Sequence, residues 1–183
     1  MTSDVLAKIK GQAQAAQDNG KEAPPRKLCL VASKGSLDMA YPPLILANAA
    51  RMSGIEVDLF FTFWGLDIIN KKKMGKVNIS TVGNPAFSMA PYAPWLKIPT
   101  WLGLIPGMSH VATWMMRNEI KKLDFPPIPE FIEMLVDAGA KLYGCKMSMD
   151  MMDLTQEDLV EGAEVLGAME FMELAEDAQV MFV

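Results

Sequence analysis

The chain has few of the residues that build disulfide scaffolds, metal centres and histidine-dependent active sites. Its 183 residues include two cysteines and one histidine. Cys29 and Cys145 match no CxxC or zinc-binding spacing, and two cysteines cannot form a disulfide framework. His110 has no second histidine and no nearby Ser/Asp pattern, so neither a metal site nor a catalytic triad can be assembled around it. We therefore expect a protein without a metal, in a reducing compartment.

The chain also lacks an excess of positive charge. Its 17 basic and 22 acidic residues give a net charge of −5, which excludes the electrostatic footprint of a nucleic-acid-binding protein. The acidic residues are concentrated towards the end, because residues 147–183 hold ten of them and no lysine or arginine. One face of this end is expected to be negative.

The first 25 residues have no apolar segment or cleavage site of the signal-peptide kind, which makes the cytoplasm the expected location. They are polar and rich in Gln and Ala, and the spacing of Val5, Ile9, Ala13 and Ala16 predicts one weakly amphipathic helix. Asn19-Gly20 and Pro24-Pro25 interrupt any regular element that follows. Residues 1–25 are therefore interpreted as a polar appendage, either mobile or docked on a partner.

Apolar runs of strand length alternate with helical patterns through residues 26–183. Strands are expected near 26–32, 55–63, 140–144 and 179–183, and helices over 36–53, 128–138 and 168–177. This alternation predicts a three-layer α/β domain with a mostly parallel sheet of about five strands, of flavodoxin-like topology. Sites in such folds form at the carboxyl ends of strands, here at residues 33–36, 62–66 and 144–148.

A hydrophobic insertion at about residues 74–116 interrupts this pattern. Lys97 is the single full charge between residues 77 and 116, and the stretch carries five prolines together with Trp95, Trp101 and Trp114. Proline and glycine break the apolar run, which argues against a transmembrane helix. We expect the insertion to pack on a second subunit or to lie at a membrane surface, with the tryptophans as anchors; packing within the domain is the remaining alternative.

Cys145 is the strongest candidate for a chemical role. It follows the predicted strand at 140–144 and precedes a helical pattern, and a helix N-terminus lowers the pKa of a thiol through its free amides and its dipole. Lys146 is positioned to add to this effect. The alternative is a small core residue, since buried cysteines pack well. Cys29 lies inside the first strand and is interpreted as structural.

Two strings indicate a family: FFTFWGL at residues 60–66 and CKMSMDMM at residues 145–152, supported by ILANAARMSGIEVDLF at residues 45–60. They resemble the DsrE/DsrF-like sulfur-relay proteins, in the longer branch with a hydrophobic insertion after the Phe-Trp-Gly-Leu turn. The resemblance covers residues 26–183. The family closes its cysteine motif with Met-Gly, whereas this chain has Met152-Asp153.

The resemblance implies a sulfur carrier of sulfurtransferase type, in which Cys145 accepts sulfane sulfur as a persulfide and passes it to a partner thiol without a cofactor. It also implies a DsrE-like fold, a homo-oligomer, TusA-like carriers or rhodaneses as partners, and membrane-surface contact through residues 74–116 at the inner face of the membrane.

Supporting roles are expected for residues at the same sheet edge. Ser148 and Lys146 are candidates to hydrogen-bond the terminal sulfur, while Trp64, next to Gly65 in the turn, and Met147 are candidates to shield it. Two other functions remain open. One is a non-catalytic oligomeric or membrane-surface adaptor that uses the insertion, and the other is a small nucleotide- or flavin-binding module that uses the same crevice.

Overall fold

A computed structural model describes residues 26–80, 88–89, 93–97 and 107–183. Its centre is a five-stranded sheet in the order β6-β5-β2-β1-β7, in which every pair of neighbours is parallel. The strands are β1 (Lys27–Ala32), β2 (Glu56–Phe61), β5 (Lys141–Cys145), β6 (Ala163–Leu166) and β7 (Gln179–Phe182). The predicted α/β fold with a parallel sheet of about five strands is confirmed.

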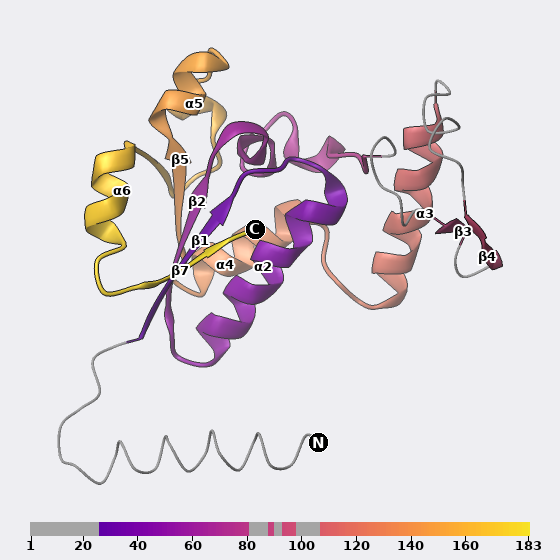
Figure 1. Cartoon of the computed structure of the whole chain (residues 1–183), viewed down its shortest axis with the longest axis horizontal. Coiled ribbons are helices and arrows are strands. Elements are labelled where there is room, and N and C mark those ends of the chain that lie inside the picture. Colours follow the sequence, from indigo (N-terminus) through magenta and orange to yellow (C-terminus); the bar gives the residue numbers. More distant parts are fainter. Residues whose placement is uncertain (1–25, 81–87, 90–92, 98–106) are drawn as a thin grey trace, which may run out of the picture.

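The order of the strands determines which face each helix covers. The chain moves from β1 through β2 and β5 to β6 in one direction, and then returns to the opposite edge as β7. Right-handed crossovers therefore place α2 (Leu37–Met52) and α4 (Ile128–Asp137) on one face and α6 (Ala168–Leu174) on the other, as Figure 1 shows. The short helix α5 (Lys146–Met151) continues β5 at the carboxyl edge of the sheet.

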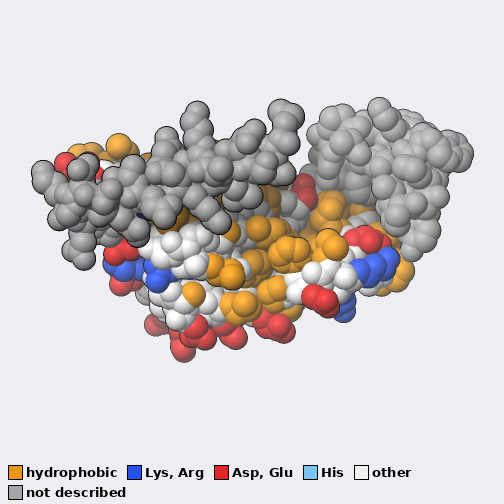
Figure 2. Space-filling model, turned by 90° about the horizontal axis from the view of Figure 1, so that it is seen from below, with side chains coloured by type: hydrophobic (Ala, Val, Ile, Leu, Met, Phe, Trp, Pro, Cys, Tyr) orange, Lys and Arg blue, Asp and Glu red, His pale blue; other side chains and the backbone are white. Residues whose placement is uncertain are grey.

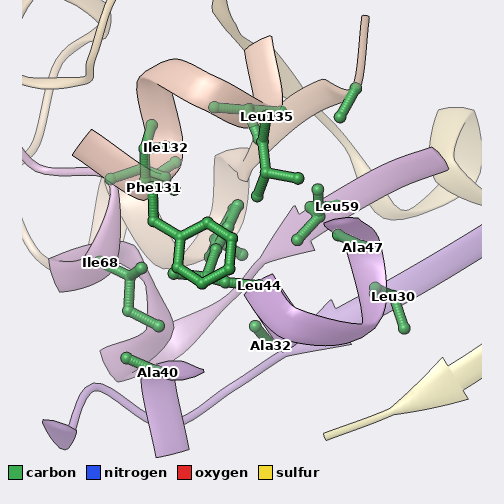
Figure 3. Close-up of a cluster of buried hydrophobic side chains, with 14 of the residues drawn as sticks. Leu30, Ala32, Ala40, Leu44, Ala47, Leu59, Ile68, Phe131, Ile132 and Leu135 are labelled. Carbon is green, nitrogen blue, oxygen red and sulfur yellow. The ribbon is translucent and has the colours of Figure 1, made fainter. Parts of the chain in front are cut away.

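Alternation along the strands creates two separate cores, because successive side chains point to opposite faces. The larger core joins α2 and α4 to the sheet, with Leu30, Leu44, Leu59 and Phe131 among its buried members (Figure 3). The smaller core lies under α6, where Phe171 stacks on Phe60 with ring centroids 4.4 Å apart. Its buried members are Cys29, Val31, Phe60, Tyr143, Cys145 and Phe171.

The described parts of the insertion are the 3₁₀ turn η2 (Met74–Lys76), the antiparallel pair β3 (Ser88–Met89) and β4 (Ala93–Lys97), and helix α3 (Met108–Lys122). Two sets of hydrogen bonds join its two ends. The Ile79 amide donates to Thr113 Oγ1 over 2.9 Å, and Arg117 donates to the carbonyls of Gly75 and Val77. The middle of α3 is therefore fixed to the chain that leaves the sheet domain.

The insertion's expected anchors are described only in part. Trp114 on α3 is 65% exposed, Trp101 lies outside the described residues, and Trp95 is described as backbone of β4 only. Within the described ranges, no helix combines the length and the apolar character needed to cross a bilayer. The predicted appendage, residues 1–25, also lies outside the described part of the chain.

Candidate functional site

Cys145 is the last residue of β5 and the N-cap of α5, which confirms the predicted junction between a strand and a helix. The side chain is 5% exposed and belongs to the smaller core. Gly144 makes the junction tight, because a Cβ atom there would lie 3.0 Å from both Leu159 Cδ1 and Met149 Sδ. The first turn of α5 consequently packs directly against the end of the sheet.

Two opposing effects set the acidity of the Cys145 thiol. Burial opposes its ionisation and raises the pKa, but hydrogen bonds from the hydroxyl and amide of Ser148, the hydroxyl of Thr62 and the amide of Met147 lower it. The hydrogen bonds prevail, so the pKa of Cys145 lies below the ordinary value for cysteine. A thiolate is the reactive form of cysteine, and this site favours it.

Thr62 also belongs to the site. The sequence places it in the strand-end segment 62–66, but its motif gives no separate supporting role to this residue. Its Oγ1 lies 3.0 Å from the Oγ of Ser148, and both residues are buried. Thr62 follows β2, the strand next to β5, and has the same parity as Phe60, so it points to the face that carries Cys145. The one sequence feature that points to Thr62 is its position, because it places a hydroxyl group directly after a buried strand.

The turn after β2, the 3₁₀ helix η1 (Phe63–Ile68), holds Thr62 in place. Phe63 adopts a left-handed backbone conformation with φ of 47°, which costs a residue with a Cβ atom about 1 kcal/mol. The Gly65 amide donates to the carbonyls of Thr62 and Ser33, and a Cβ atom at Gly65 would lie 2.2 Å from the carbonyl oxygen of Ala32. Gly65 thus permits the close contact between the turns that follow β1 and β2.

The three remaining predicted site residues lie at the surface. The Lys146 ammonium is 3.7 Å from a carboxylate oxygen of Asp150, and it is not among the groups that lower the pKa of Cys145. Met147 and Trp64 are 65% and 63% exposed. Helix α5 contacts η1, so these two apolar side chains stand on neighbouring elements at the carboxyl edge of the sheet. Their shielding role stays a prediction.

The second thiol has the opposite character. Cys29 in β1 is fully buried, and burial followed by the charge of Asp58 raises its pKa, with Lys27 acting in the other direction. Strand β2 lies between the strands of the two cysteines. Cys29 is in register with Lys141 of β5 through Asp58 of β2, and Cys145 lies four residues further along β5. Strand spacing and rise place them about 16 Å apart, too far for a disulfide.

An ion pair fixes the helix that covers this face. Lys27 Nζ lies 2.9 Å from the buried Asp58 carboxylate and donates to the carbonyl of Leu174, the last residue of α6. Burial, followed by the charges of Asp58 and Glu164, raises the pKa of Tyr143 to about 12, so the phenol stays neutral. The surroundings of Cys145 on the α6 side are therefore ordered and mostly apolar.

Fold and site together define an α/β thiol protein whose buried, acidified cysteine caps a helix. Across the described residues, no group of three or more His, Cys, Asp and Glu side chains is placed to hold a metal ion. A model of the DsrE/DsrF/DrsH-like family matches residues 24–183, and the chain belongs to this family.

Individual relatives agree with this assignment. The chain is 37% identical over 157 residues to the sulfur carrier protein DsrE2 of Allochromatium vinosum, covering 85% of this chain and 96% of the relative. It is 27% identical over 156 residues to the uncharacterized protein YrkE of Bacillus subtilis, covering 85% and 94%. The crystal structure of the ychN protein from E. coli shares the fold, with a TM-score of 0.51, 15% identity and coverage of 86% and 99%.

Proposed function

We propose that this protein is a sulfur carrier that holds sulfane sulfur as a persulfide on Cys145 and passes it to the thiol of a partner protein. The observation that carries the proposal is the placement of the buried Cys145 at the N-cap of α5, where the amides of Met147 and Ser148 and the neighbouring hydroxyls lower the pKa of its thiol. A 37% identical relative that is named a sulfur carrier supports the same role.

The transfer is a thiol exchange that needs no external oxidant. The Cys145 thiolate attacks the terminal sulfur of a donor persulfide, the bond between the two donor sulfurs breaks, and the donor leaves as a thiolate. Cys145 then carries the terminal sulfur and its proton. In the second step an acceptor thiolate attacks that terminal sulfur, and Cys145 leaves as a thiolate. The amides and hydroxyls at Cys145 stabilise the anion in both steps.

The need for partners follows from the absence of a second thiol near Cys145. Cys29 is too distant to act as a second thiol, so donor and acceptor come from other molecules, for which TusA-like carriers and rhodaneses are the proposed classes. A homo-oligomer, and contact of residues 74–116 with a membrane surface at its cytoplasmic side, belong to the same proposal.

Intact mass spectrometry after incubation with polysulfide tests the assignment. We expect the reduced wild type to gain about 32 Da, one sulfur atom, as a reversible persulfide. Cys29→Ala is the matched control and is expected to gain the same mass, while Cys145→Ala gains none. Loading that persists in Cys145→Ala would contradict the role of this thiol. A wild type that gains no mass from any donor would favour a non-catalytic adaptor.

A further inference from the structure

Helix α2 is apolar on its outward face as well as on the face it buries. Leu37, Ala40, Leu44 and Ala47 face the core, as expected for a helix that packs on a sheet. On the outward side, Ile45, Leu46, Ala49 and Met52 are exposed and Met39 and Pro42 are half-buried, and no charged side chain occurs between residues 39 and 50. Met52 is 82% exposed. A helix that is apolar on its outward side as well as on its core side normally has both sides covered.

This outward apolar stripe, from Met39 to Met52, has the width of a single helix, and four of its six side chains are exposed. It spans 14 residues, about 20 Å along the axis at the α-helical rise. A stable interface between two proteins requires roughly 20–30 residues from each side. Figure 2 shows hydrophobic side chains gathered across the middle of one face of the molecule, with charged side chains at its margins. Six side chains in one stripe therefore suit one amphipathic helix better than a second folded domain.

The N-terminal residues of the chain have a suitable length to cover this stripe. They join the domain near the C-terminal end of α2, at Met52. The stripe Val5, Ile9, Ala13 and Ala16 covers 12 residues, about 18 Å of helix. The carbonyl of Arg26 accepts a hydrogen bond from the amide of Glu56, four residues after Met52, so residue 26 lies within about 20 Å of the end of α2. Residues 17–25 easily span this distance.

We propose that residues 4–16 form a helix that packs along the outward face of α2, with Ala16 next to Met52 and Val5 next to Met39. Small alanines then face the largest exposed side chain, and Ile9 meets Ile45 and Leu46. This contact covers an apolar surface that would otherwise promote association between copies.

Engineered disulfides in the full chain test this packing, in a Cys145→Ser background that removes the reactive thiol. Ala16→Cys combined with Met52→Cys is expected to form a disulfide within one chain about tenfold faster than Ala16→Cys combined with Glu173→Cys on α6, at the opposite face, because docking raises the effective concentration of the first pair. Adding Ile9→Asp is expected to remove most of this advantage. Adding Gln14→Asp, on the other side of the predicted helix, is expected to leave it intact.

Two results would overturn the proposal. Equal rates for the two cysteine pairs would mean that residues 4–16 do not rest on α2. Disulfides that form only between chains, in proportion to protein concentration, would mean that a second copy covers the stripe. Because every variant lacks Cys145, neither result bears on the sulfur-carrier assignment.

Discussion

Replacing Ser148 by alanine should make Cys145 a weaker acid and a slower nucleophile. The Ser148 hydroxyl stabilises the thiolate directly, and a hydrogen bond to a charged group contributes about 1.5–3 kcal/mol. Its loss reduces the thiolate population below the pKa by roughly tenfold to a hundredfold. A more basic thiolate is intrinsically more nucleophilic, which offsets about half of that loss on a logarithmic scale. Alkylation at neutral pH should consequently slow by about three- to tenfold.

The assay is the rate of iodoacetamide alkylation between neutral and alkaline pH, with Cys145→Ser as the blank. The rate profile of Ser148→Ala should move to higher pH, and Thr62→Ser, which retains a hydroxyl opposite Ser148, should follow the wild type. Removing Ser148 Oγ also removes its 3.0 Å hydrogen bond with Thr62 Oγ1, at a cost of about 1 kcal/mol of folding free energy, because the Thr62 hydroxyl keeps Cys145 as a partner. A folded Ser148→Ala protein with the wild-type rate profile would refute the reasoning.

Three further predictions concern stability. The pKa of Tyr143 is raised to about 12 in the folded state, so its contribution to stability is complete below pH 10 and is lost as the pH rises towards 12. The free energy of unfolding, measured with urea, should therefore fall by about 2 kcal/mol less over this pH range in Tyr143→Phe than in the wild type. Gly65→Ala should lower the free energy of unfolding by about 2 kcal/mol or more through its clash with Ala32, whereas Gly75→Ala, with no atom within 4 Å, should change it by less than about 0.5 kcal/mol. Asp153 has φ of 53°, so Asp153→Ala should lower the melting temperature and Asp153→Gly should leave it nearly unchanged.

The fold was predictable because local and global signals agree. The apolar run from Lys27 to Ala32 is buried and parallel-paired on both sides, and α4 begins at Ile128 and ends within one residue of its expected limit. The position of Cys145 between a strand and a helix was likewise evident, since the strand pattern ends where the methionine spacing of a helix begins.

The site was predictable only in part, because its hydrogen bonds join residues that are far apart in the sequence. The contact between Thr62 and Ser148 depends on β2 and β5 being neighbours, which the chain order does not establish. Lys146 follows Cys145 directly, yet its side chain extends to Asp150. Asp153 stands where the family resemblance implies a glycine, and it adopts the left-handed conformation for which glycine is suited.

The most direct test of the sulfur-carrier account is to follow both molecules during discharge of the loaded protein. Wild-type protein carrying one added sulfur is freed from the donor and mixed with glutathione, and the masses of both are recorded over time. The account predicts that the protein loses about 32 Da while glutathione gains the same mass as a persulfide. An added sulfur that remains on the protein, or that leaves without ever appearing on the thiol acceptor, would contradict it.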